Sequence, residues 1–181
     1  MKKILSFGFI LLTILFSACS SDNNDDSDVN NVVSATINGT AWKSTKVNSV
    51  TLIKVKGENQ QRFDINIQDN AQMLSLACSS ELTTADAMPL KAYTFDENND
   101  IIDALFINTY LIDGNTFTEH FVETGTLTIT AMDPAKKTVS GTFSFTSKKV
   151  GSLQTKVNTP EVVEVKNGVF TNLSYTVLTT P

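Results

Sequence analysis

The sequence predicts an all-β fold, an antiparallel β-sandwich or barrel of about ten strands. Apolar and polar residues alternate with a period of two in most segments after residue 32, as half-buried strands require. Turn dipeptides such as Asn38-Gly39 and Asn167-Gly168 separate these segments at short spacing. We expect no long helix after residue 32. Two interiors remain open, a filled sandwich and a lipocalin-like barrel with a cavity.

The clearest pattern is a hairpin over residues 124–146, with the sequence TGTLTITAMDPAKKTVSGTFSFT. Asp133-Pro134 supplies the turn, because Pro fixes φ at the second turn position and Asp bonds the backbone beyond it. One face carries the core residues Leu127, Ile129, Ala131, Val139, Gly141, Phe143 and Phe145. The other face carries Thr and Ser and lies in water. Matching the apolar faces places Ile129 opposite Phe143 and Leu127 opposite Phe145, with a loop of odd length.

Asn38-Gly39 predicts a tight hairpin that pairs Ala35 with Trp42. Trp42 is then a core residue rather than a stacking platform for a ligand. Three further strands follow, over residues 49–56, 63–68 and 73–78. The last of these places Cys78 on an apolar face. Cys78 is therefore interpreted as a small buried hydrophobic residue, because the sequence offers neither a nearby histidine nor a helix N-terminus to activate it.

The second half of the chain is less regular before and after its hairpin. Residues 81–91 break the alternation and leave room for one short helical turn before Pro89. Residues 101–112 are apolar on both alternating sets, which indicates a central strand covered on both faces. The expected fold is completed by a strand over residues 116–123, a polar loop over 148–160, and a last hairpin over 162–178 that turns at Asn167-Gly168.

The first nineteen residues resemble a targeting signal. Lys2-Lys3 forms a positive start, and Ile4–Phe16 is an apolar stretch too short to span a bilayer, which needs about 20 residues. Small residues, Ser17-Ala18, stand directly before Cys19, as in a bacterial lipoprotein signal. We therefore expect a signal peptide over residues 1–18 and acylation of Cys19, which anchors the chain in a membrane.

Residues 19–31 change composition abruptly, with the sequence SSDNNDDSDVNN after the cysteine. Such a segment cannot offset the entropy of ordering, so we expect a disordered acidic tether ahead of a single domain over residues 32–181. Acidic residues directly after an acylated Cys resemble the signal that sends such lipoproteins to the outer leaflet of the outer membrane. We expect an outer-membrane, lipid-anchored protein that faces the cell surface; the alternative is attachment that faces the periplasm.

The composition excludes some classes of partner. The formal net charge is −5 and the sequence has no basic block, which argues against nucleic acid. The sequence has two cysteines, so acylation of Cys19 leaves no pair for an intramolecular disulfide. An exported domain of this size must then be held together by its apolar core.

Two places in the sequence could carry chemistry. His120 is the single histidine and no nucleophile motif accompanies it, so we expect a half-exposed strand residue and assign no catalytic residue. Asp96, Asn98 and Asp100 match the opening of a calcium loop, whose alternate oxygens converge on one cation. The match ends at Ile101, which stands where the loop needs Gly. These three residues are a weak calcium candidate, and the alternative is a simple acidic turn.

Four segments carry a resemblance to a known family: residues 35–42, 126–130, 139–145 and 167–170. They are similar to an uncharacterised family of small secreted lipoproteins of Bacteroidetes-type bacteria, a domain of unknown function. The resemblance implies an all-β fold and assigns no functional residue. We expect a lipid-anchored envelope domain with a non-enzymatic binding or structural role, whose partner is a protein or a glycan. The alternative is a hydrolase acting on envelope or extracellular glycans, which needs two carboxylates facing each other across a cleft.

Overall fold

The computed structural model describes residues 33–96, 104–108, 118–150 and 160–181. Within these ranges the chain is nearly all β-structure and contains no α-helix, which confirms the predicted fold class. The strands are β1 (Ser34–Ile37), β2 (Thr40–Lys43), β3 (Lys46–Val55), β4 (Gln60–Gln68), β5 (Gln72–Glu81), β6 (Ala92–Asp96), β7 (Ala104–Asn108), β8 (Thr118–Asp133), β9 (Thr138–Lys149), β10 (Val162–Ser174) and β11 (Thr176–Thr180). A 3-10 turn, η1 (Lys56–Glu58), joins β3 to β4.

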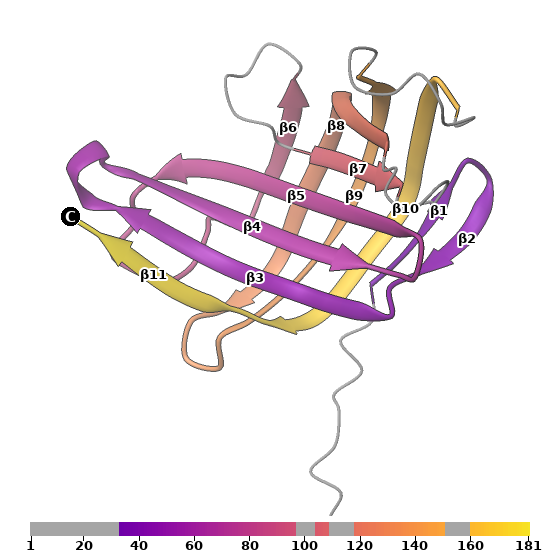
Figure 1. Cartoon of the computed structure of the whole chain (residues 1–181). Helices are drawn as coiled ribbons and strands as arrows, with labels where there is room; N and C mark the ends of the chain where they lie inside the picture. Colours follow the sequence, from indigo (N-terminus) through magenta and orange to yellow (C-terminus); the bar gives the residue numbers. More distant parts are fainter. Residues whose placement is uncertain (1–32, 97–103, 109–117, 151–159) are drawn as a thin grey trace, which may run out of the picture.

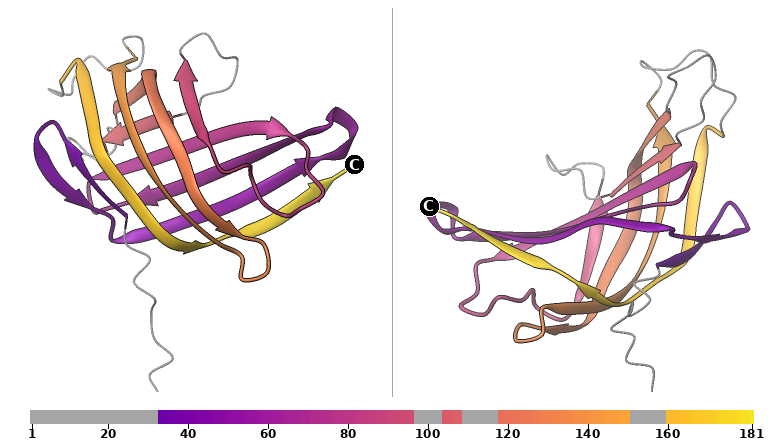
Figure 2. Two further views of the ribbon diagram at one scale, coloured as in Figure 1. Left: turned by 180° about the vertical axis from the view of Figure 1, so that it is seen from behind. Right: turned by 60° about the horizontal axis from the view of Figure 1, so that its bottom comes forward.

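The strands form one sheet in the order β11-β3-β4-β5-β7-β8-β9-β10-β1-β2, and β6 also pairs with β8. Only Tyr175 separates β10 from β11, so one bent strand pairs with β9 in one half of the fold and with β3 in the other. In Figure 1, β3, β4, β5 and β11 run across the steeper β8, β9 and β10. The sheet thus curls back on itself, and Figure 2 shows the barrel-like shape from two further sides.

One apolar cluster occupies the inner face of the curled sheet. In β4, Phe63 and Ile67 are fully buried, as the unbroken alternation predicted. Cys78 in β5 is also buried, which confirms the predicted position of its side chain. Trp42 is buried and lies opposite Ala35, again as predicted. The inner face is therefore built from the residues that the period of two assigns to it.

β8 and β9 form the predicted hairpin with the predicted inner face, but the predicted register is wrong. Phe143 and Phe145 are each 3% exposed. Leu127 lies opposite Phe143, and Ile129 lies opposite Gly141, so the true pairing differs from the expected one by two residues. A shift of two keeps every side chain on its face, which is why the alternation alone could not exclude it.

A bulge and a loop of four residues cause this difference in register. The pairing shifts between Ile129 and Ala131, so Thr130 is an extra residue in β8. Beyond the bulge the alternation is reversed. Ala131 is exposed, so its predicted place in the core is wrong, and Met132 packs against the core instead. The hairpin closes through four residues, 134–137, rather than through a loop of odd length.

The two Asn-Gly dipeptides adopt different structures. Asn38 and Gly39 both have positive φ, 48° and 79°, and the chain reverses there as predicted. At the second dipeptide only Asn167 has positive φ, 54°, and β10 continues through it with a bulge. The predicted hairpin turn at Asn167-Gly168 is therefore wrong. A Cβ atom at Gly168 would lie 2.5 Å from the ring of Phe143, so this position requires glycine.

The centre of the sheet agrees with the sequence, whereas the segment after β5 does not contain the helical turn that its pattern allowed. β7 lies between β5 and β8, with Phe106 buried and its outward neighbours half-buried. Residues 82–91 are irregular and are held by Gln61 of β4, which is fully buried. Its side chain donates to the carbonyl of Ala87 and accepts from the backbone N–H of Thr83.

Several expectations fall outside the described residues. These are the signal peptide, Cys19 and the tether, together with most of the polar loop over residues 148–160.

Candidate binding face

The outward side of β6, β8 and β9 is lined by Thr and Ser. Three cross-strand pairs of β8 and β9 carry it: Thr124 with Thr146, Thr126 with Ser144, and Thr128 with Thr142. β6 adds Thr94 beside Thr126. We term this surface the hydroxyl face, and it consists of Thr94, Thr124, Thr126, Thr128, Thr130, Ser140, Thr142, Ser144 and Thr146. Its hydroxyl groups repeat at about 4.8 Å across the strands and about 6.8 Å along them.

The alternation that fills the core also produces the hydroxyl face. Leu127, Ile129, Phe143 and Phe145 are apolar and buried at inward positions, and the outward positions between them carry short hydroxyl side chains. Thr suits this location because a β-branched side chain packs well on a pleated surface. The sequence predicted a Thr and Ser face in water for this hairpin, and the structure confirms it.

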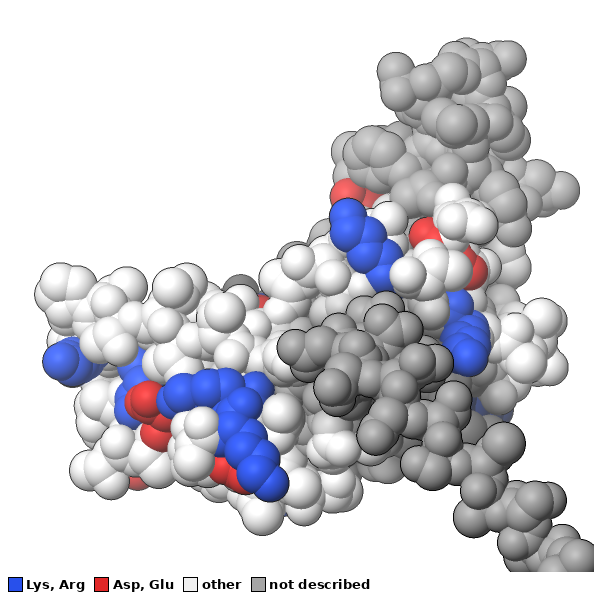
Figure 3. Space-filling model, turned by 90° about the horizontal axis from the view of Figure 1, so that it is seen from below, with Lys and Arg blue, Asp and Glu red and all other residues white. Residues whose placement is uncertain are grey.

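Charged residues lie beside the hydroxyl face rather than within it. Lys166 of β10 binds Glu164 at 2.8 Å (Nζ to Oε2). At the other end of β8, the outward Phe121 is 38% exposed and lies opposite Lys148. Seen from below, Lys and Arg side chains form mixed groups with Asp and Glu, and uncharged surface separates these groups (Figure 3). The hydroxyl face itself therefore offers hydrogen-bonding groups without net charge.

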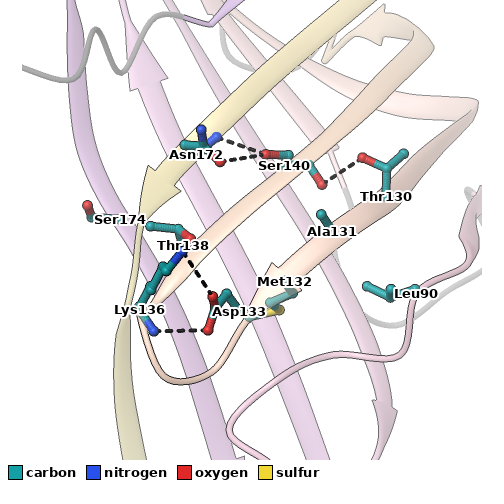
Figure 4. Close-up of a pocket in the computed structure, with 10 residues that line it drawn as sticks. All are labelled: Leu90, Thr130, Ala131, Met132, Asp133, Lys136, Thr138, Ser140, Asn172 and Ser174. Carbon is teal, nitrogen blue, oxygen red and sulfur yellow. Dashed lines mark hydrogen bonds and ion pairs between the residues drawn. The ribbon is translucent and has the colours of Figure 1, made fainter.

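A first hollow, of about 540 Å³, lies beside the turn between β8 and β9, and we term it the turn hollow. It is lined by Leu90, Thr130, Ala131, Met132, Asp133, Lys136, Thr138, Ser140, Asn172 and Ser174 (Figure 4). Several of its polar groups bond to one another. Ser140 Oγ accepts from the backbone N–H of Asn172 at 2.8 Å, and Thr130 Oγ1 donates to the Ser140 carbonyl at 3.2 Å.

Asp133 in the turn hollow has a structural task. Its Oδ1 accepts from the backbone N–H groups of Ala135 at 2.9 Å and Lys136 at 3.0 Å. These two donors hold the pKa of the Asp133 carboxyl below its ordinary value, the Lys136 amide most strongly. The carboxylate thus closes the turn that Asp133-Pro134 predicted, and it is not positioned as a catalytic acid.

A second hollow, of about 560 Å³, lies beside the bulge of β10, and we term it the bulge hollow. It is lined by Thr126, Thr128, Thr142, Phe143, Ser144, Lys166, Asn167, Gly168 and Val169. Among the described residues, none forms a hydrogen bond with the hydroxyls of Thr126, Thr128, Thr142 or Ser144. Sequence reasoning missed the β10 side of this hollow, because it interpreted Asn167-Gly168 as a turn.

His120 is not the half-exposed strand residue that the sequence predicted. Its side chain is fully buried on the inner side of β8, with the ring of Phe106 edge-on at 5.5 Å. Nε2 donates to the Pro160 carbonyl at 2.8 Å, and Nδ1 has no hydrogen-bond partner in the part of the chain that the structure describes. Burial lowers the pKa of His120, so the imidazole is neutral near pH 7. The Pro160 carbonyl lies 40 residues away, and no local pattern indicated this contact.

The carboxylate of Asp86 stabilises the fold through two ion pairs. Asp86 binds Lys137 at 2.8 Å and Lys54 at 3.1 Å, and these hydrogen bonds lower the pKa of its carboxyl. The Tyr175 hydroxyl donates to the Asp86 carbonyl. Together these contacts fasten the irregular segment 82–91 to β3 and to the bend between β10 and β11.

The calcium candidate is not tested by the structure. Asp96 ends β6 with its backbone opposite Thr124, and Asn98 and Asp100 lie outside the described residues. Within the described ranges, no group of three or more His, Cys, Asp or Glu residues could hold a metal ion. Calcium binding by Asp96, Asn98 and Asp100 stays a prediction.

A family model described as a domain of unknown function (DUF6252) matches residues 29–174. The match includes every strand from β1 to β10. No curated protein and no solved structure matches the chain. Among the described residues, no helix has the length and apolar character needed to cross a membrane.

Proposed function

The chain belongs to the DUF6252 family, a domain of unknown function, and we propose that this member is a lipid-anchored domain of the bacterial cell envelope that acts by binding and not by catalysis. The hydroxyl face carries the binding role. It is an outward surface of uncharged side chains with a hollow beside each end, and the hydroxyls of Thr126, Thr128, Thr142 and Ser144 have no hydrogen-bond partner in the described chain. These hydroxyl groups form hydrogen bonds with a partner outside the domain, which is a glycan or a protein.

The alternative, a glycan hydrolase, has less support. It needs two carboxylates facing each other across a cleft, one of them free to carry a proton. Asp86, Asp64 and Glu164 each bind a cation at 2.8 to 3.1 Å, and the Asp133 carboxylate caps a turn. Purified protein should therefore release no reducing ends from envelope or extracellular polysaccharides. Sustained release by the wild type, lost on substitution of one carboxylate, would contradict a purely binding role.

The proposed anchor rests on the sequence. The short apolar segment and the small residues before Cys19 support acylation, and the acidic tether after it supports export to the surface side of the outer membrane. Cells that express the chain with a fatty-acid label should incorporate that label into the wild type and not into the Cys19→Ala variant. Equal labelling of both proteins would refute the anchor.

The proposed location at the cell surface can be tested separately. Protease added to intact cells should remove the wild-type protein, whereas a variant with Ala at Asp22, Asp25 and Asp26 should be protected because it is retained inside. Protection of the wild type would favour the alternative, a protein that faces the periplasm.

Binding through the hydroxyl face can be tested with a charge placed in it. The full chain, purified in detergent, is immobilised and exposed to solubilised envelope and to extracellular polysaccharide. Thr128→Lys should abolish capture, because its ammonium group enters the bulge hollow. The control is Thr51→Lys, on the outward side of β3. Capture that survives Thr128→Lys places the binding surface elsewhere, and no capture by the wild type refutes the binding role.

A further inference from the structure

We infer that the bulge hollow is a binding site for a neutral polysaccharide, with one sugar ring seated between the hydroxyls of β8 and β9 and the bulge of β10. This inference rests on the proposed binding role and adds to it the place and the chemical class of the ligand. It follows from three observations: unused hydroxyl groups, absence of charge on the floor of the hollow, and the geometry of the bulge.

The hydroxyl groups of the floor are available to a ligand. Thr126, Thr128, Thr142 and Ser144 line the hollow from two neighbouring strands, and their hydroxyls have no hydrogen-bond partner elsewhere in the described chain. Each hydroxyl group can donate one hydrogen bond and accept two. A group of four therefore matches a ligand that is itself made of hydroxyls, because every contact can be satisfied in either direction.

The turn hollow, which is nearly as large, has this property only in part. There Ser140 Oγ already accepts from the Asn172 N–H and Thr130 Oγ1 already donates to a carbonyl. Hydrogen-bonding capacity in the turn hollow is thus partly used within the chain, whereas all four floor hydroxyls of the bulge hollow are free to bind a ligand. This contrast selects the bulge hollow.

The charges and the apolar surface of the hollow indicate that the ligand is a neutral sugar. The floor carries no ionic group, and the one cationic side chain of the wall, Lys166, is already bound to Glu164 at 2.8 Å. A phosphate or carboxylate ligand would therefore meet no free cation. Val169, 42% exposed, offers a small apolar contact that suits the C–H side of a sugar ring and is too small to anchor a protein partner.

The bulge of β10 shapes the second wall. Asn167 has a φ of 54° and lies beside the floor, and its exposed amide offers both a donor and an acceptor. Bulges are frequent beside binding sites because they direct a side chain away from the regular sheet positions. The bulge thus adds an amide to a surface that otherwise carries only hydroxyls.

The experiment measures retardation of the full chain, purified in detergent, in native gels cast with a neutral α-glucan, β-glucan, mannan or xylan. The wild type should be retarded by at least one of them. Thr128→Val combined with Thr142→Val keeps β-branched side chains and removes two hydroxyls, so affinity should fall about tenfold or more. Asn167→Gly tolerates the same φ and removes the amide, and it should weaken binding as well.

Two matched controls accompany these variants. Thr51→Val makes the same chemical change on the outward side of β3, and Ser174→Ala removes a hydroxyl from the turn hollow. Both should bind like the wild type. Thermal unfolding of all variants shows whether each is folded. Should the double variant unfold, Asn167→Gly alone decides the assignment.

The contrary outcomes are distinct. Equal retardation of the wild type and the folded bulge-hollow variants would overturn the site. Retardation only by an anionic polysaccharide such as polygalacturonate, removed by salt, would overturn the neutral ligand class. Absence of retardation in all four neutral gels also overturns the inference. If envelope capture still recovers a protein in that case, the proposed binding role stands; if capture also fails, both are wrong.

Discussion

Replacing Phe143 with Ala should destabilise the domain by about 3–5 kcal/mol. Phe143 is 3% exposed on the inner side of β9, and its ring stacks on that of Phe170 at a centroid distance of 6.4 Å. A buried phenylalanine removes roughly 150–250 Å² from water, which at about 25 cal/mol per Å² corresponds to ~4–6 kcal/mol. Alanine retains part of this area. Gly168 lies against the ring and has no side chain with which to fill the space.

Urea unfolding followed by circular dichroism measures this loss in wild type and variant at the same pH. Phe121→Ala is the control, because Phe121 lies on the outward side of β8 and is 38% exposed. It should cost about 1 kcal/mol or less. A loss below 1 kcal/mol for Phe143→Ala, or equal losses for the two variants, would refute the assignment of β9 to the core sheet.

The other predictions concern a glycine, a histidine and a thiol. Gly141→Ala should cost about 2–3 kcal/mol in urea unfolding, because its Cβ would lie 2.2 Å from a backbone oxygen of β8; Gly57→Ala, with a nearest atom at 3.4 Å, should be tolerated. Because burial lowers the pKa of His120, the unfolded chain binds more protons below about pH 6.5. Stability should therefore be constant above that pH and fall as the pH drops toward the lowered pKa, a fall between pH 7 and 5 that His120→Phe should lack. Cys78 is 2% exposed, so in a Cys19→Ser protein a thiol reagent should react slowly until urea unfolds the chain; rapid labelling of native protein would contradict its burial.

The period of two was sufficient to predict which side of most strands is buried. It assigned Phe63, Phe143 and Phe145 to the core correctly, because burial acts on each side chain separately. It could not determine register, because a shift of two residues leaves every face unchanged. The bulge at Thr130 and the four-residue loop depend on how two whole strands fit together. Neither is visible in any short stretch of sequence.

The same limit explains the two Asn-Gly dipeptides. A type I′ hairpin turn needs positive φ at both residues, as at Asn38-Gly39, whereas Asn167 alone has positive φ at the second dipeptide and β10 continues there with a bulge. Long-range pairing with β9 and β1 keeps β10 extended there. The bulge hollow was consequently missed, although its Thr and Ser floor was predicted. The buried position of His120 was missed for a related reason, since its carbonyl partner comes from a distant segment.

The bent strand formed by β10 and β11 determines when the domain can complete its folding. At one seam Thr176 reaches the carbonyl of Val50, and at the other Glu164 reaches Asn38, so each seam joins residues 126 positions apart. Closing such long loops costs entropy before any contact repays it, and pairings of this kind fold slowly. Neither seam can form while the C-terminal third of the chain is still being made. The β-domain therefore closes only when nearly all of its chain has been made, and its inner apolar face stays uncovered along both seams until then.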